Sequence, residues 1–140
     1  MNLTPVTDML REQIGLAPES LGPTVLSRAV EARMRKRGLV AAEDYAACLT
    51  GDLQEFQALI DDLTVPETWF FRGGEVFPFL AKRIAENARR QPAAKRYRVL
   101  SVPCSTGEEP YSLAMALLEL GVPAVSWWID GVDLCARSIE

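Results

Sequence analysis

The sequence contains no histidine, and this absence excludes several kinds of active site. Without an imidazole the chain cannot form a Ser–His–Asp triad, a histidine general base or an HExxH zinc site. Cysteine is scarce as well: Cys48, Cys104 and Cys135 are widely spaced and match no zinc-binding pattern. Such cysteine usage is typical of a reducing compartment, so we expect a cytoplasmic protein without a metal site.

Long apolar runs and a strong positive charge are also missing. No run approaches the roughly 18 apolar residues of a transmembrane helix, and residues 1–13 lack the features of a secretion signal, so we expect no membrane insertion. The net charge of −4 provides no overall positive field, so we expect no nucleic-acid partner. With 49% hydrophobic and 24% charged residues, the composition is that of a globular protein.

Helical periodicity dominates residues 1–64, which we predict to form a small all-helical domain. Apolar residues recur there every three or four positions. A loop is expected over 16–22, and a capping box is expected where Glu55 follows Asp52 by three residues. The predicted helices span residues 4–14, 23–37, 42–49 and 52–63.

The second of these predicted helices carries a block of positive charge. Residues 28–37 hold five basic residues and one acid. Arg28, Arg35 and Lys36 lie off the apolar stripe of this helix, so they are candidates for contact with an acidic partner. The simpler interpretation, a solvated helix face, stays open.

A linker over residues 65–96 is predicted to follow. It contains the aromatic run 69–71, where neither the helical nor the strand period holds, then a helix over 75–90 and a polar connector over 91–96. The simplest interpretation of the aromatic run is a hydrophobic linker that packs between two layers.

The hydrophobic period changes after residue 96. A buried strand is predicted over 97–103 and a second strand over 125–132, with a helix between them that has Pro110 in its first turn. Two strands joined by a helix form a βαβ unit with parallel strands. The chain is therefore expected to be α/β, predominantly helical, with a helical bundle preceding the first βαβ unit of a Rossmann-like domain over 97–140.

A ligand of such a unit binds at the carboxyl ends of its strands. Gly107 in the turn after the first strand permits close approach, and Asp133 after the second strand is placed to accept ribose hydroxyls. Glu108 and Glu109 would repel a pyrophosphate, which disfavours NAD or FAD and favours a cationic nucleoside. The alternative for this pair is structural, because acidic residues complement the dipole at a helix N-terminus.

Three features together resemble the chemotaxis-receptor methyltransferase family, the CheR type: L-T-V-P-E-T-W-F-F-R over 63–72, C-S-T-G-E-E-P-Y-S over 104–112, and Asp133. The resemblance implies a bacterial enzyme of signal transduction that uses S-adenosyl-L-methionine (SAM) to methylate glutamate side chains of chemoreceptors, releasing S-adenosyl-L-homocysteine (SAH). The positions it implies for the cofactor are Thr68, Arg72, Gly107, one of Glu108 and Glu109, and Asp133. Pro66 departs from the family, which often has a cofactor-contacting Asn there.

The resemblance also suggests how the chemistry would proceed without histidine. A glutamate carboxylate, with a reference pKa near 4.3, is already ionised at neutral pH and needs no general base. We expect Arg72 to act as the catalytic cation near the cofactor carboxylate or the incoming glutamate, with a structural ion pair as its alternative role. The acidic methylation helix of the receptor would meet Arg28, Arg35 and Lys36.

The chain supplies only two strands of the family's sheet, so we expect the cofactor site to be truncated and this chain to be inactive alone. Apolar faces around Val99, Val102, Trp127 and Trp128 would stay partly exposed, which makes a dimer through the exposed strands a hypothesis. Two other functions stay open: a non-catalytic helical module that binds a receptor or regulator, and a different SAM enzyme that shares the first βαβ unit.

Overall fold

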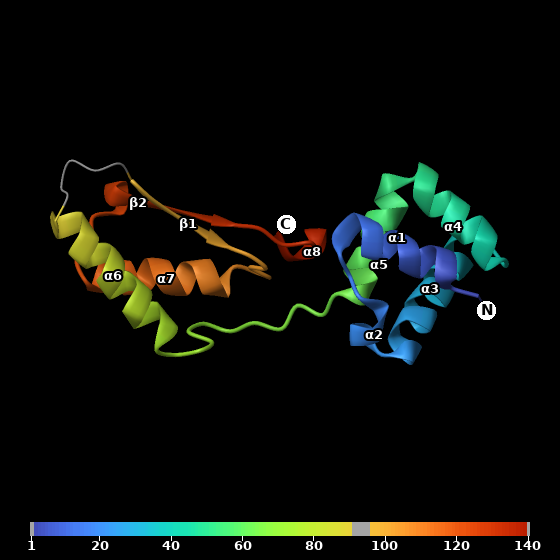
Figure 1. Cartoon of the computed structure of the whole chain (residues 1–140), viewed down its shortest axis with the longest axis horizontal. Helices are drawn as coiled ribbons and strands as arrows, with labels where there is room; N and C mark the ends of the chain where they lie inside the picture. Colours follow the sequence, from blue (N-terminus) through green and yellow to red (C-terminus); the bar gives the residue numbers. More distant parts are fainter. Residues whose placement is uncertain (1, 91–95, 140) are drawn as a thin grey trace. The chain divides into compact units, whose positions relative to one another are not determined.

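A computed structural model describes residues 2–90 and 96–139, so the predicted connector over 91–96 lies outside the described residues except for Arg96. The chain divides into two compact units, which we call unit 1 (residues 1–65) and unit 2 (residues 66–140). It is mostly helical with one small parallel sheet, which confirms the predicted fold class (Figure 1).

Unit 1 is entirely helical, as its periodicity predicts. Gly15 and Gly38 end two of its helices in the left-handed conformation, at φ 67° and 68°. A short helix over Pro18–Leu21 replaces most of the loop predicted over 16–22, so that prediction is wrong. Four residues are too few to show a hydrophobic period. The helices of unit 1 are α1 (Thr4–Ile14), α2 (Pro18–Leu21), α3 (Pro23–Arg37), α4 (Ala42–Gly51) and α5 (Leu53–Leu63).

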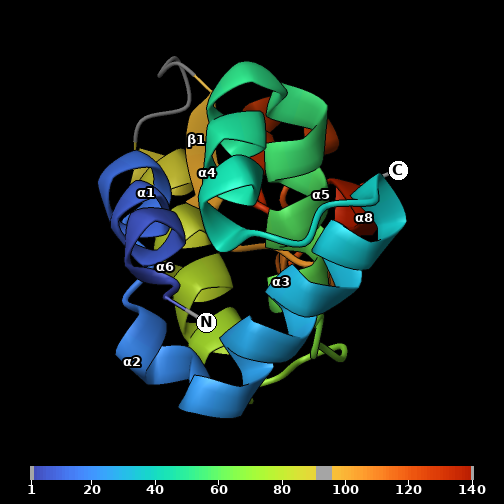
Figure 2. The same ribbon diagram turned by 90° about the vertical axis from the view of Figure 1, so that its right-hand side faces the viewer.

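One closed apolar core holds this bundle together. The stripes predicted on α1 and α3 point inward, so Val6, Leu10 and Val30 are fully buried. Tyr45 and Leu49 from α4 join them, and α5 adds a broad buried face. In Figure 2, which looks onto unit 1, α4 and α5 lie side by side. A core of this kind needs no further layer to cover it.

A buried carboxylate sits among the helices of unit 1. Glu55 is 3% exposed, and its two oxygens accept hydrogen bonds from Arg33 at 2.8 and 2.6 Å, with the Tyr45 hydroxyl donating at 3.0 Å. The Arg33 hydrogen bonds lower the pKa of Glu55, whereas burial raises the pKa of Tyr45. Asp52 caps α5 through the backbone N–H groups of Gln54 and Glu55. The predicted capping box is therefore only half formed. Its Asp52 side chain caps the helix, but the Glu55 side chain pairs with Arg33.

Unit 2 contains the βαβ unit. Residues 97–101 pair in parallel with 127–131, in the register Val99↔Ile129. Both strands are shorter than predicted, because Ala124–Ser126 forms a 3₁₀ turn (η1) and Pro103 has no N–H for a ladder. The elements of unit 2 are α6 (Val76–Arg90), β1 (Tyr97–Ser101), α7 (Glu108–Glu119), β2 (Trp127–Gly131) and α8 (Ala136–Ile139).

The two faces of this sheet differ. Helices α6 and α7 lie on one side of it (Figure 1), where Val99, Trp127 and Ile129 pack against their small core. On the other face Leu100 is 61% and Trp128 is 53% exposed. The prediction of a buried strand is therefore wrong for β1, which alternates between a covered and a bare face.

Candidate functional site

The turn after β1 lies where the sequence places a ligand. Gly107 adopts φ 101°, a conformation that disfavours a side chain, and precedes the first residue of α7. The helix starts at Glu108, so both acids of the motif belong to its first turn. The turn is tied to the strands through the Cys104 N–H, which donates to the carbonyl of Val132 at 3.0 Å.

Asp133 follows β2 and contacts the same turn. One of its carboxylate oxygens accepts from the Ser105 N–H at 2.7 Å, and the other accepts from the Cys135 N–H at 2.8 Å. The structure therefore brings Asp133 to the turn that contains Gly107. Each carboxylate oxygen has more than one lone-pair site, so both retain capacity for a ligand hydroxyl.

A cavity of about 220 Å³ lies beside this turn and contains groups of opposite charge. Arg72 and Glu109 both line it, together with Ser101 at the end of β1. Its other lining residues are Val76, Phe77, Leu80, Val99, Leu100, Pro110, Leu113 and Ile129. A cation and an anion in one mostly apolar cavity suit a small zwitterion.

Arg72 is exposed, and its surroundings leave its charge available. One of its terminal nitrogens donates to the carbonyl of Glu67, and the guanidinium lies 4.6 Å from the centre of the Trp69 ring. Across residues 2–90 and 96–139, Arg72 has no carboxylate within ion-pair distance. Its charge thus remains free for an anionic ligand.

The two glutamates of the motif have different partners. Glu108 accepts from the Thr106 hydroxyl at 2.6 Å, whereas Glu109 accepts from the Ser101 hydroxyl at 2.6 Å. Only Glu109 of the pair lines the cavity with Arg72. Thr68, Gly107 and Asp133 do not line this cavity.

Sequence reasoning missed Ser101. It is 5% exposed, and its hydroxyl donates to the Glu109 carboxylate. The one signal in the sequence is a polar residue at the end of an apolar strand, at the edge where ligands of parallel sheets bind.

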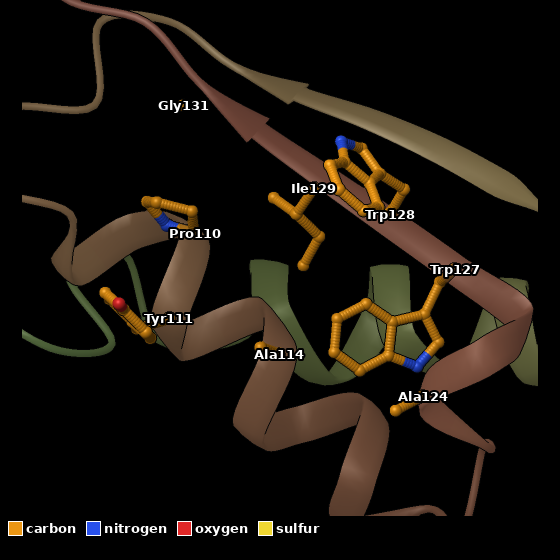
Figure 3. Close-up of a pocket in the computed structure, with 8 residues that line it drawn as sticks. All are labelled: Pro110, Tyr111, Ala114, Ala124, Trp127, Trp128, Ile129 and Gly131. Atoms are coloured by element: carbon orange, nitrogen blue, oxygen red, sulfur yellow. The ribbon is translucent and has the colours of Figure 1, made fainter.

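A larger hollow of about 510 Å³ lies between α7 and β2 (Figure 3). Its walls are aromatic and aliphatic, with Tyr111 and Ala114 on α7 and Trp127 and Ile129 extending toward them from β2. No charged side chain lines it. This hollow therefore lacks the groups that a charged ligand requires, and the smaller cavity is the candidate site.

The cations predicted to meet a partner lie in unit 1. Arg28, Arg35 and Lys36 are exposed on α3. Arg33 and Arg37, on the same helix, are held instead by Glu55 and Asp52. In the part of the chain that the structure describes, no ion pair involves the three exposed cations.

The described residues contain neither a candidate membrane span nor a candidate metal cluster. No helix among them is both long and apolar enough to span a bilayer. Nor do three or more Cys, Asp or Glu side chains gather there as a metal site would require.

Comparison with known proteins gives the family. Residues 2–64 match the model described as CheR methyltransferase, all-alpha domain, and residues 66–140 match CheR methyltransferase, SAM binding domain. The "Probable biofilm formation methyltransferase WspC" of Pseudomonas aeruginosa is 44% identical over 132 residues, which cover 94% of this chain and 31% of that protein. The "Chemotaxis protein methyltransferase" of Escherichia coli is 39% identical over 111 residues, which cover 77% of this chain and 37% of that protein.

The chain thus spans about a third of the length of these relatives. The family model indicates S-adenosylmethionine as the cofactor of the domain in unit 2. Both family models, matched end to end across nearly all of the sequence, establish that the chain belongs to the CheR methyltransferase family.

Proposed function

We propose that this chain is the N-terminal part of a SAM-dependent methyltransferase that methylates glutamate side chains of a chemoreceptor-like signalling protein. Its family and its relatives named as chemotaxis and biofilm methyltransferases support this. Because the chain spans a third of those relatives, methyl transfer belongs to the whole protein. This chain contributes part of the cofactor site and is inactive alone.

The observation that carries the proposal is the cavity shared by Arg72 and Glu109. The amino acid end of SAM is a zwitterion, so its carboxylate suits the Arg72 guanidinium and its ammonium suits the Glu109 carboxylate. Asp133 would accept the ribose hydroxyls through its remaining lone pairs. The residues present therefore fit the cofactor, and between the two acids of the motif we assign the cofactor contact to Glu109.

The other residues of the motifs would shape the site. Gly107 keeps the turn free of a side chain, and Glu108 would hold the turn through Thr106. Thr68 is half-buried at the start of the aromatic turn and would contact the cofactor from that side. When bound, SAM supplies a sulfonium methyl group, which a receptor carboxylate can accept without a general base. Arg72, as the catalytic cation, would orient the reacting groups electrostatically.

The receptor would dock on unit 1. Exposed Arg28, Arg35 and Lys36 suit the acidic methylation helix of such a receptor. Exposed charges are screened over about 8–10 Å at physiological salt, so this binding weakens as salt rises. We place the reaction in the cytoplasm, where the three free cysteines stay reduced. The proposal also includes a dimer through the exposed strands of the sheet.

Isothermal titration calorimetry with SAH tests the cofactor assignment. Arg72→Ala and Glu109→Gln are each expected to weaken binding at least tenfold, the value of about one charged hydrogen bond. Glu108→Gln is the matched control and should change the affinity little. Equal losses for Glu108→Gln and Glu109→Gln would contradict the assignment to Glu109. Failure to bind SAH, both by this chain and by a protein of the relatives' full length that contains it, would identify the chain as a non-catalytic binding module.

A further inference from the structure

We propose that Ser112 is a positioning residue that holds the turn containing Arg72 against the end of α7 containing Glu109. The inference rests on the proposed function, because it concerns how the two charged sides of the cofactor cavity are kept in place. Ser112 is uncharged and does not line the cavity, so it acts only through the residues that it contacts.

The Ser112 hydroxyl bridges two distant segments. Ser112 is fully buried on α7. Its hydroxyl donates to the carbonyl of Glu108 and accepts a hydrogen bond from the Phe71 N–H at 2.8 Å. A serine that donates to the carbonyl four residues earlier is ordinary in a helix. The acceptor role is not ordinary, because Phe71 lies 41 residues away in the sequence.

The residue that Ser112 holds has an uncommon backbone conformation. Phe71 adopts φ 57°, which residues with a side chain rarely do, and such a conformation persists only where its surroundings fix it. The Phe71 carbonyl accepts a hydrogen bond from the Gly74 N–H at 2.9 Å, within the turn itself. Two contacts from outside the turn also fix it. One is the hydrogen bond to Ser112, and the other is the Phe71 ring, whose centre lies 5.6 Å from that of Phe77 at 85°.

The consequence concerns Arg72, the next residue. Without the hydroxyl, the Phe71 N–H has no partner on α7, and the backbone can relax toward an ordinary negative φ. That change would rotate the peptide that leads to Arg72. On the other side of the bridge, Glu108 precedes Glu109. One hydroxyl thus links the segments that carry the cation and the anion of the cavity.

Ser112→Ala tests this link with two readouts. Amide hydrogen exchange at Phe71, followed by NMR on the whole chain, reports the hydrogen bond without any cofactor. Calorimetry with SAH reports the cavity. We expect exchange at Phe71 to accelerate and SAH affinity to fall, each about tenfold, as for the loss of one hydrogen bond.

Ala116→Gly is the matched control, since it weakens the same helix one turn further on without touching Phe71. This variant should leave SAH affinity unchanged. Any faster exchange at Phe71 should be no larger than its loss of global stability explains. The isosteric pair Ser112→Thr and Ser112→Val covers the case in which Ser112→Ala fails to fold. Because Thr keeps the hydroxyl and Val does not, Thr should retain slow exchange at Phe71 and Val should lose it.

The outcomes separate the two proposals. Unchanged protection of Phe71 in Ser112→Ala, or equal behaviour of the Thr and Val variants, overturns the role of Ser112. Faster exchange with unchanged SAH affinity overturns it as well, because Ser112 would then be structural only. If the unsubstituted chain binds no SAH, its part of the cofactor site is insufficient alone, and exchange at Phe71 decides whether Ser112 holds the turn. The proposed function itself fails only if the longer protein binds no SAH.

Discussion

Unit 1 and unit 2 use apolar surface in opposite ways. In unit 1 the large hydrophobic side chains converge on one core, and among its described residues only Val25, Val40, Leu53 and Val65 are exposed. Unit 2 has a small core rich in alanine and exposes many more, including Leu100 and Trp128 on its sheet. A single βαβ layer covers one face of its sheet and leaves the other bare.

The units differ in the same way in their use of charge. Unit 1 directs Glu55 and Arg33 inward, where each satisfies the other. Unit 2 keeps Arg72 without a carboxylate partner among the described residues and places it in a cavity with Glu109. The buried ion pair of unit 1 thus stabilises the fold, whereas Arg72 of unit 2 is available to a ligand. The predictions below test this contrast.

The largest effect is expected from removing the buried carboxylate of unit 1. Glu55→Ala leaves Arg33, whose side chain is 14% exposed, without its bidentate partner. Breaking a buried pair costs about 3–5 kcal/mol. Because Asp62 still lies 3.8 Å from the Arg33 guanidinium and compensates part of its charge, we expect the lower end of that range. Urea denaturation of the whole chain measures the loss. Glu19→Ala, which breaks an exposed pair with Arg11, is the control and should leave the free energy of unfolding unchanged within error.

The pH dependence of unit 1 should follow the same cluster. Because the pKa of Glu55 is lowered in the folded state, its stabilising contribution is present above about pH 4.5 and is lost as the pH falls. The pKa of Tyr45 is raised, so its contribution is present below about pH 10 and is lost as the pH rises. Urea denaturation midpoints measured across pH check both the acid limb, from Glu55, and the alkaline limb, from Tyr45, of the stability profile. An acid limb as steep in Glu55→Gln as in the unsubstituted chain would contradict this assignment.

A smaller effect is expected at the bare face of unit 2. If Trp128 contributes to self-association, Trp128→Lys should shift the chain from dimer toward monomer, since a buried aromatic contact is replaced by a repelling charge. Sedimentation velocity over a range of concentrations measures the shift. Val40→Lys, at an exposed position in unit 1, is the control. If the unsubstituted chain is monomeric at every concentration, the proposed dimer is wrong.

The smallest effect is expected at Gly131, at the end of β2. An alanine methyl group there would lie 3.1 Å from the Cys104 sulfur, which is closer than ordinary packing allows. Gly131→Ala should therefore destabilise unit 2 by about 1 kcal/mol and displace the turn after β1. Cys104→Ala removes the sulfur, so the double variant should show a favourable coupling energy in a thermal denaturation cycle. Additive effects of the two substitutions would contradict the clash.

The sequence predicts the helices of unit 1 well because their apolar stripes hold the helical period over two or more turns. It does not predict α2, which is too short to show a period. It predicts that apolar strand faces stay partly exposed, but not that Val99 and Trp127 lie on the covered face, because this depends on what covers the sheet. The proposed cofactor residues come from motifs, yet the cavity that joins Arg72 to Glu109 arises only when distant segments meet. The bridge from Ser112 to Phe71 spans 41 residues, and no local pattern encodes it.

The central claim is that Arg72 and Glu109 recognise the amino acid end of the cofactor. Calorimetry that compares SAH with 5′-methylthioadenosine, a related thioether that lacks the amino acid end, tests it directly. The account predicts that Arg72→Ala weakens SAH at least tenfold and leaves 5′-methylthioadenosine unchanged. Equal weakening of both ligands, or of neither, would contradict it.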